Sequence, residues 1–433
     1  MKKYNVVICG GGSTYTLPMI KTLLDNSDKF PIQNITLFDV DASKQQKIYQ
    51  AAQVMATPFG VDIAQSYQLD GTFSGADFVF MQIRSGGLEM RELDEKIPLA
   101  NDCVGQETCG AGGFAYGMRS VVDVIEIVKA VRVQAEEAWI INYSNPAAIV
   151  AEATNRVFPN DKKIINLCDM PIAILDGFAE ALGTERQNLT PRYFGLNHFG
   201  WFTHLYDQDG NDLLPGIKER LTQGNMMPEE LKEDGDWVKT FEQLSKMAID
   251  LKGHIPNTYL QYYLYPEYIV SKSDKNYTRA NAVMDNRLQA VQDQCDYIIE
   301  NNTIEGSGLE RGVHGTYIVE LATALAMNEK KEFIMIVPNT GIISNFSHGA
   351  MVEVPCIVSK NGAEPIHVGE IETFYKGLME NQYAYEKLTV DAILNKDYDA
   401  ALKALTLNRT VVNVDTAKSI LDAFNSQMHF NLK

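Results

Sequence analysis

The stretch that decides the fold is Asn5-Val-Val-Ile-Cys-Gly-Gly-Gly-Ser-Thr-Tyr-Thr-Leu-Pro-Met19. The apolar run before the glycines predicts a buried strand, the glycines predict a tight turn, and the residues after them favour a helix. In such a turn the glycines let the backbone approach a pyrophosphate, and the helix N-terminus supplies free N–H groups and a positive dipole end. We therefore expect a dinucleotide-binding turn in which Gly10, Gly12 and Ser13 contact the cofactor.

A second strand is predicted at Asn34-Ile-Thr-Leu-Phe-Asp39, and it ends in an acid. A carboxylate in this place binds a ribose 2′-hydroxyl and repels a 2′-phosphate, so Asp39 favours NAD over NADP. Tyr15 departs from the usual pattern, because it stands where a third glycine is common. An ordinary βαβ unit with a Gly-rich turn is the alternative. It ranks second because the strand, turn, helix and acid-tipped strand follow in order.

The composition is that of a soluble globular protein of 433 residues, with 45% hydrophobic and 22% charged residues. The net charge of −18 argues against nucleic acid or an anionic membrane surface as a partner. No charge-free segment approaches the roughly 18 residues that span a bilayer. The six cysteines form no CxxC pair, so neither a disulfide scaffold nor a zinc ribbon is expected. We expect a cytoplasmic protein that does not bind membranes.

Strand-like and helix-like runs alternate through the first ~200 residues, which predicts an α/β fold with a Rossmann-like, doubly wound parallel sheet. Arg192-Tyr-Phe-Gly-Leu-Asn197 is expected to be a further strand of that sheet. The pattern is less regular beyond this point. We expect an NAD-binding domain over residues 1–198 and an α+β substrate and oligomerisation domain over residues 199–433.

Two Gly-rich segments follow the predicted third strand. In Arg84-Ser-Gly-Gly-Leu-Glu-Met-Arg91, two arginines flank a turn and are suited to bind a carboxylate or phosphate, although a solvated surface loop explains them equally well. Gly105-Gln-Glu-Thr-Cys-Gly-Ala-Gly-Gly-Phe114 predicts a loop shaped by positive φ angles close to a ligand, with Glu107 as a supporting acid. A purely structural loop is the alternative.

Polar residues also end later strands of the predicted sheet. Asn145 precedes a proline and is expected to be extended, with its amide free for a ligand hydroxyl; a helix-capping role is the alternative. Cys168 follows one predicted strand and His198 follows the next. A thiolate and an imidazole at neighbouring strand ends can share a metal and leave positions open for substrate oxygens, whereas a buried cysteine and a core histidine are the structural alternative. A Tyr-rich segment, Asn257-Thr-Tyr-Leu-Gln-Tyr-Tyr-Leu-Tyr265, contains candidates for a base, although aromatics at this spacing are usually core.

Taken together, these motifs resemble glycoside hydrolase family 4, the NAD-dependent phosphoglycosidases, over essentially the whole chain. The resemblance is carried by the glycine turn, the two Gly-rich segments, the Asn145-Pro146 pair and Asn197-His198-Phe-Gly-Trp201. Cys168-Asp-Met-Pro171 resembles the subgroup that acts on α-linked 6-phosphoglucosides such as maltose 6′-phosphate, whereas members that act on β-glucosides tend to carry Asn after the cysteine.

The family resemblance implies a mechanism without net oxidation. NAD⁺ takes a hydride from C3 of the 6-phosphoglucosyl unit, a base removes the C2 proton, the glycosidic oxygen leaves, water adds, and the hydride returns. The resemblance implies roles for these residues: Cys168 and His198 as ligands of a divalent metal, expected to be Mn²⁺; Asp169 as the acid; Tyr262 as the base, with Tyr263 and Tyr265 as alternatives; and Arg91, Asn145 and Arg279 as substrate and phosphate contacts. A homodimer or homotetramer is also implied.

Other functions compete with this interpretation. A 6-phospho-β-glucosidase of the same family differs only in stereochemistry. A 2-hydroxyacid dehydrogenase is a further alternative, because the segment from Arg84 to Arg91 and the Asn145-Pro146 turn also resemble parts of the lactate and malate dehydrogenases. That activity needs a histidine paired with an acid, and no Gly-His-Gly segment occurs in the matching region. An NAD sensor without catalysis is disfavoured because all of the predicted site residues are present.

Overall fold

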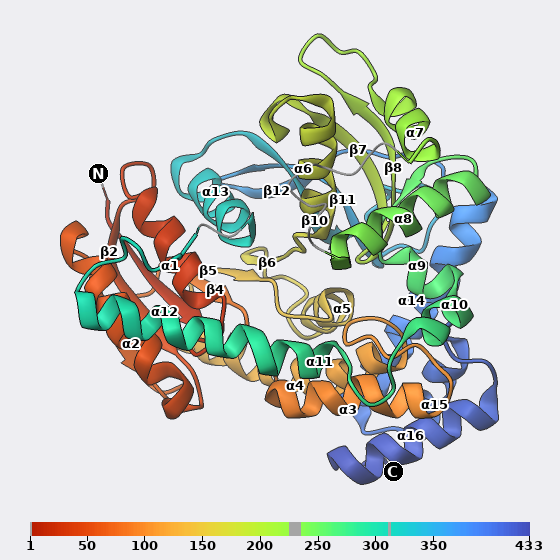
Figure 1. Cartoon of the computed structure of the whole chain (residues 1–433), viewed down its shortest axis with the longest axis horizontal. Coiled ribbons are helices and arrows are strands. Elements are labelled where there is room, and N and C mark those ends of the chain that lie inside the picture. Colours follow the sequence, from red (N-terminus) through yellow and green to blue (C-terminus); the bar gives the residue numbers. More distant parts are fainter. Residues whose placement is uncertain (1, 225–234, 311–312) are drawn as a thin grey trace.

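The computed structural model describes residues 2–224, 235–310 and 313–433. Its strands form one mixed sheet in the spatial order β3-β2-β1-β4-β5-β6-β10-β11-β7-β8-β9, and β12 pairs with β11. Figure 1 shows this sheet passing through the middle of the molecule with helices on both sides.

The strands of the N-terminal half are parallel, as the sequence predicts. They are β1 (Tyr4–Cys9), β2 (Ile32–Phe38), β3 (Asp62–Ser66), β4 (Phe78–Met81), β5 (Trp139–Asn142) and β6 (Ile164–Asn166). The helices between and after them are α1 (Thr16–Asp25), α2 (Ala42–Ala56), α3 (Gly87–Ala100), α4 (Gly110–Gln134), α5 (Ala147–Val157) and α6 (Met170–Leu182). The order of these strands is that of a dinucleotide-binding sheet.

The remaining strands extend the sheet with antiparallel pairings. They are β7 (Thr190–Leu196), β8 (Phe199–Tyr206), β9 (Ile255–Pro256), β10 (Lys331–Pro338), β11 (Met351–Ser359) and β12 (Gly362–Pro365). β10 joins the two halves of the sheet, because Ile336 pairs with Asn166 of β6.

The prediction that Arg192–Asn197 continues the parallel sheet is wrong. Leu196 pairs with Phe199, so β7 and β8 form a hairpin whose loop consists of Asn197 and His198. A two-residue loop can only join antiparallel strands, whereas parallel strands need a long crossover. The predicted domain boundary at residues 198 and 199 falls within this hairpin, and the division itself stays a prediction.

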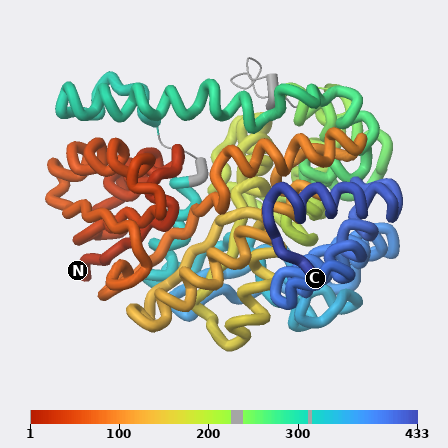
Figure 2. The backbone as a smooth tube through the Cα atoms, turned by 90° about the horizontal axis from the view of Figure 1, so that it is seen from below, coloured from red at the N-terminus to blue at the C-terminus, as the bar shows by residue number. Residues whose placement is uncertain are grey.

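Helices of the C-terminal half cover the sheet and connect the two halves. They are α7 (Leu214–Thr222), α8 (Gly235–Asp250), α9 (Leu260–Leu264), α10 (Pro266–Lys272), α11 (Arg279–Ala282), α12 (Leu288–Asn301), α13 (Val313–Met327), α14 (Thr373–Asn395), α15 (Tyr398–Leu407) and α16 (Val414–Met428). α12 packs against α2, as Figures 1 and 2 both show, and Lys47 of α2 pairs with Asp296 of α12 at 2.8 Å. A helix from the C-terminal half therefore rests on the dinucleotide-type half.

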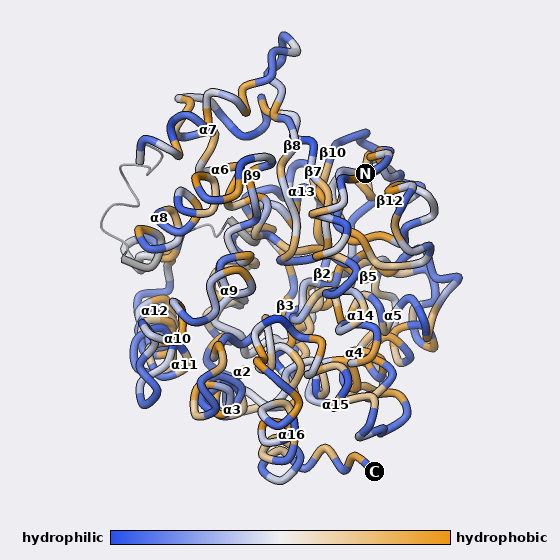
Figure 3. Tube along the Cα trace, turned by 90° about the vertical axis from the view of Figure 1, so that its right-hand side faces the viewer, coloured by the Kyte–Doolittle hydropathy of each residue, from blue (hydrophilic) through white to orange (hydrophobic). Residues whose placement is uncertain are grey.

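The core lies on both faces of the sheet. Side chains alternate along β1, so Val6 and Ile8 belong to one apolar cluster and Val7 and Cys9 to another. In Figure 3 hydrophobic segments lie mostly in the interior and hydrophilic ones around the periphery. Among the helices of the described ranges, none combines the length and the apolar character needed to cross a membrane.

Candidate active site

The glycine turn after β1 is shaped by its glycines and fastened to the end of β2. Gly10 has φ +85°, and a Cβ placed there would lie 2.8 Å from the backbone oxygen of Gln82. The N–H of Gly12 donates to Oδ2 of Asp39 at 2.8 Å. The predicted turn and the predicted acid are therefore in direct contact.

Tyr15 lies on the outside of this turn rather than between helix and strand. Its side chain is 41% exposed, and Nη1 of Arg287 donates to its hydroxyl at 2.6 Å. Arg287 ends a five-residue π-helix, Val283–Arg287, that leads into α12. The departure from the glycine pattern is thus accommodated by a contact between the two halves of the chain.

The structure brings Cys168 and His198 together. Cys168 follows β6 and His198 occupies the β7–β8 turn, yet Sγ of Cys168 and Nε2 of His198 are 3.3 Å apart. Both side chains are buried. The reason is a row of paired residues across the sheet, in which Asn166 pairs with Ile336, Ile336 with Glu353, and Glu353 with Gly195. Each candidate metal ligand lies two or three residues beyond an end of this row.

The two side chains suit a divalent metal with open coordination positions. Burial lowers the pKa of His198 to about 4, so the imidazole is neutral, which is the form that binds metals. Burial raises the pKa of Cys168 well above its usual value, so the thiol must lose its proton when it coordinates an ion. Within the described ranges, no three His, Cys, Asp or Glu side chains are grouped to hold a metal by themselves. A pair of protein donors leaves the other positions to ligand oxygens.

Asp169 is next to Cys168 in the chain, and Asn145 follows β5, the strand that pairs with β6. Asp169 is the residue before α6 but makes no side-chain cap to that helix, and Sγ of Cys168 lies 3.8 Å from its Oδ1. Asn145 forms a cis peptide with Pro146 after β5. Its Oδ1 is buried and has no hydrogen-bond partner within the described residues, which marks an acceptor that a ligand can satisfy.

The arginines of the first Gly-rich segment bind carboxylates of the protein itself. Arg84 pairs with Glu107, and Nη2 of Arg91 lies 3.2 Å from the other oxygen of that carboxylate. Nε of Arg91 also donates to Glu95 at 2.8 Å. Burial acts in the opposite direction, but these guanidinium groups keep the pKa of Glu107 below its usual value. Arg91 lies within α3 rather than in a loop.

Arg279 is exposed at the start of α11, which packs on α3. The next residue, Ala280, donates its N–H to Glu95 at 2.8 Å. Because Glu95 also accepts from Arg91, α11 is linked to the ion pairs that Arg91 forms.

The second Gly-rich segment is only partly a loop, which corrects the prediction. Gly110 alone among its glycines has a positive φ, of 64°, and α4 begins there. Gly112 and Gly113 are instead required by packing, since a Cβ at either would lie within 2.6 Å of a backbone oxygen. The segment thus allows the start of α4 to pack closely against the backbone of residues 94–108.

The tyrosines of the third segment occupy different environments. The hydroxyl of Tyr265 donates to Asp250 at 2.9 Å on an exposed part of the surface. Tyr263 is buried against Phe199. Tyr262 is half-buried and its ring contacts Tyr259, with ring centroids 5.6 Å apart.

Tyr259, which the sequence interpretation did not select, contacts the site directly. Its ring stacks on that of His198 with centroids 3.9 Å apart. Its N–H donates to Oδ1 of Asn257 at 3.0 Å, so the backbone at this position is fixed. The signal available in the sequence was the polar pair Asn257-Thr258 directly before it, which marks a turn rather than a core helix.

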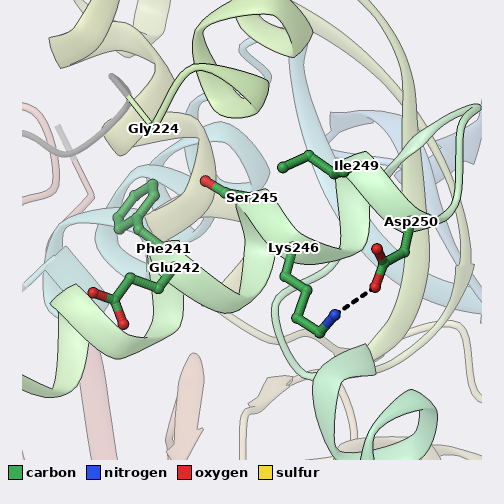
Figure 4. Close-up of a pocket in the computed structure, with 7 residues that line it drawn as sticks. All are labelled: Gly224, Phe241, Glu242, Ser245, Lys246, Ile249 and Asp250. Atoms are coloured by element: carbon green, nitrogen blue, oxygen red, sulfur yellow. Dashed lines mark hydrogen bonds and ion pairs between the residues drawn. The ribbon is translucent and has the colours of Figure 1, made fainter.

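Hollows also lie elsewhere on the surface. One of about 400 Å³ follows the outer face of α8 and is lined by Phe241, Ser245 and the Lys246–Asp250 ion pair, among others (Figure 4). None of the predicted site residues lines it.

The fold is that of the dinucleotide-binding α/β proteins. A lactate dehydrogenase from a deep-sea metagenome shares it at a TM-score of 0.53 with 13% identity over 91% of this chain and 100% of the other, which confirms the predicted fold class. Residues 5–184 match the model of the family 4 glycosyl hydrolases, and residues 193–411 match that of the family 4 glycosyl hydrolase C-terminal domain. This chain belongs to family 4 of the glycosyl hydrolases, as the sequence motifs predict.

Similar proteins within the family act on phosphorylated α-glucosides. The chain is 50% identical over 430 residues to phospho-alpha-glucosidase PagL of Clostridium acetobutylicum, covering 97% of both. It is 47% identical over 428 residues to a maltose-6′-phosphate glucosidase of Fusobacterium mortiferum, covering 98% of this chain and 97% of the other. A crystal structure of a 6-phospho-alpha-glucosidase from gut microorganisms, in complex with NAD and Mn²⁺, has a TM-score of 0.97, 42% identity and full coverage of both chains.

Proposed function

We propose that this chain is a 6-phospho-α-glucosidase that hydrolyses substrates such as maltose 6′-phosphate to glucose 6-phosphate, with NAD and Mn²⁺ as cofactors. The observation that carries the proposal is the contact of Cys168 with His198 at 3.3 Å, beside Asp169. The similarity to α-acting relatives at 47–50% identity favours the α-anomer.

The residues divide the chemistry among them. When bound, NAD⁺ provides a reversible hydride acceptor for C3 and the divalent metal polarises the C3 and C2 oxygens. Cys168 and His198 would hold the metal, and Asp169 would protonate the departing glycosidic oxygen. Gly10, Gly12, Ser13 and Asp39 would bind the dinucleotide.

Two tyrosines compete for the role of C2 base. Tyr262 is the residue predicted from the sequence, and its ring contacts that of Tyr259. Tyr259 stacks directly on His198, so we favour it as the base. Burial raises the pKa of Tyr259 well above its usual value, so the base role requires that a metal held by Cys168 and His198 lower it.

The substrate contacts follow from the polar groups around this pair. Asn145 has the unpartnered buried oxygen that a sugar hydroxyl can satisfy. Arg91 and Arg279 would contact the 6-phosphate, Arg91 from its position between Glu95 and Glu107. A cytoplasmic location and a homodimeric or homotetrameric assembly are further predictions.

The test is hydrolysis of p-nitrophenyl 6-phospho-α-glucoside by dialysed, reduced protein with NAD⁺ and Mn²⁺ added separately, together and not at all. We expect turnover only with both cofactors. The β-anomer and the unphosphorylated glucoside are the controls, and neither should be cleaved. Activity on the β-anomer alone would reverse the assigned stereochemistry, and net NADH formation from a 2-hydroxyacid would favour a dehydrogenase.

One variant distinguishes loss of the metal site from loss of NAD⁺ binding. Cys168→Ser should abolish the Mn²⁺-dependent turnover while NAD⁺ binding, measured by calorimetry, stays unchanged. Full activity of this variant would remove Cys168 from the metal site.

A further inference from the structure

A second cysteine contacts His198 from the side opposite Cys168. Sγ of Cys109 lies 3.9 Å from Nδ1 of His198, while Sγ of Cys168 lies 3.3 Å from Nε2. Tyr259 covers one face of the same ring. Each nitrogen of the imidazole thus contacts a sulfur atom, and the ring cannot rotate without losing one of these contacts.

The position of Cys109 is determined by the backbone around it. Its N–H donates to Oε1 of Gln106 at 2.7 Å, and the residue directly precedes α4. Its side chain makes no cap to that helix and is 1% exposed. The side chain of Tyr263 is hydrogen-bonded to it. The thiol therefore contacts His198 and does not cap the start of α4.

His198 itself has an unusual backbone. Its φ is +60°, in the left-handed region that few residues other than glycine adopt, with Asn, Asp and His the more frequent among them. Such a conformation persists only where surrounding contacts impose it, and it often marks a functional residue. The sulfur contacts and the stacked tyrosine are the contacts that fix the ring here.

We propose that Cys109 is a positioning residue whose sulfur accepts the Nδ1–H of His198 and so keeps Nε2 as the metal-binding nitrogen. A neutral imidazole carries one proton, and the partner of the protonated nitrogen decides which nitrogen is free to bind a metal. With Nδ1 facing Cys109, the free electron pair of Nε2 points to the side of Cys168. The proposal rests on the metal site of the proposed function.

The test is the dissociation constant of Mn²⁺, measured by electron paramagnetic resonance with reduced protein and saturating NAD⁺. Loss of a group that orients a metal-binding histidine weakens metal binding about 10–100-fold, so Cys109→Ala should show a loss in this range. Cys109→Ser should lose less, because its hydroxyl oxygen also accepts a hydrogen bond. Cys103→Ala is the matched control, since this thiol is equally buried but is bonded elsewhere.

The proposal is overturned if Cys109→Ala binds Mn²⁺ as tightly as the wild-type chain, or if Cys103→Ala loses as much. A second measurement needs no variant at position 109. In metal-free protein labelled with [¹⁵N]histidine, His198 should carry its proton on Nδ1, with the signal assigned by its loss in His198→Gln. Protonation on Nε2 would contradict the proposal. If the wild-type chain binds no Mn²⁺ at all, the proposed function fails, and the proton position still decides whether Cys109 orients the ring.

Discussion

The carboxyl group of Glu386 provides a prediction about stability whose size follows from the structure. Glu386 lies in α14, is 3% exposed, and accepts a hydrogen bond from Nε2 of Gln382 at 2.8 Å. Burial raises its pKa from 4.5 to about 8, against the hydrogen bond from Gln382, which lowers the pKa, and together with the nearby Glu152 and Glu353, which raise it. The group is therefore protonated in the folded chain at neutral pH.

The sign of the effect follows from proton linkage. Below pH 4.5 the carboxyl is protonated in both states, whereas between pH 4.5 and about 8 only the folded state keeps the proton. The free energy of unfolding therefore falls as the pH rises through this window. A pKa difference of this size, at 1.36 kcal/mol per unit, corresponds to a loss of about 5 kcal/mol.

Glu386→Gln removes this loss, because an amide does not ionise and its oxygen still accepts from Gln382. We measure the free energy of unfolding by urea titration at pH about 4.5 and at pH about 8. We expect the decrease between these two pH values to be about 5 kcal/mol smaller in this variant than in the wild-type chain. Asp94, whose pKa burial also raises, contributes to both proteins alike, so the difference reports on Glu386 and the carboxyls that interact with it.

Glu380→Gln is the control, since Glu380 lies in the same helix but pairs with Lys376 at the surface. It should leave the pH dependence as in the wild-type chain. Parallel pH dependences of Glu386→Gln and the wild-type chain would refute the reasoning, because they would mean that Glu386 is not held protonated in the folded state.

Three further predictions concern the site. Tyr259→Phe should lower kcat by at least about 100-fold while Tyr262→Phe changes it less, as measured with the p-nitrophenyl substrate; the reverse order would restore Tyr262 as the base. Asp169→Asn should slow substrates with poor leaving groups more than aryl glycosides, and equal losses would remove it from the acid role. Asp39→Ala should weaken the binding of NAD⁺, measured by calorimetry, and should reduce the preference for NAD⁺ over NADP⁺, because it removes the acid that repels a 2′-phosphate. An unchanged preference for NAD⁺ would contradict this.

The parts of the fold that the sequence predicts correctly are those with a strong local signal. The glycine turn, the acid at Asp39 and the parallel strands are each encoded in short runs of apolar and special residues. The contact of Gly12 with Asp39 follows from these runs alone, because each residue lies shortly after the end of one of two neighbouring strands. The approach of Cys168 to His198 was also expected, although for a reason that the structure corrects.

The order of the strands could not be predicted in the same way. β10 and β11 come from residues 331–359 and lie between β6 and β7, where the sequence suggested direct neighbours. Pairing across such distances depends on how whole faces pack, and no periodicity within a strand encodes it. Similarly, the contact of Cys109 with His198 joins residues from a helix start and a hairpin turn, so neither residue type nor spacing announces it.

The inserted strands also explain why the site is held together. Glu353 of β11 accepts hydrogen bonds from Asn197 at 2.9 Å and from the hydroxyl of Tyr193 at 3.0 Å. Asn257 donates to the same tyrosine hydroxyl at 3.3 Å and accepts from the N–H of Tyr259. One buried carboxyl from a distant strand thus fixes both the turn that carries His198 and the segment that carries Tyr259. Because the strand that supplies it lies between β6 and β7, the same insertion that breaks the parallel pattern positions the side chains that we assign to the metal and the base.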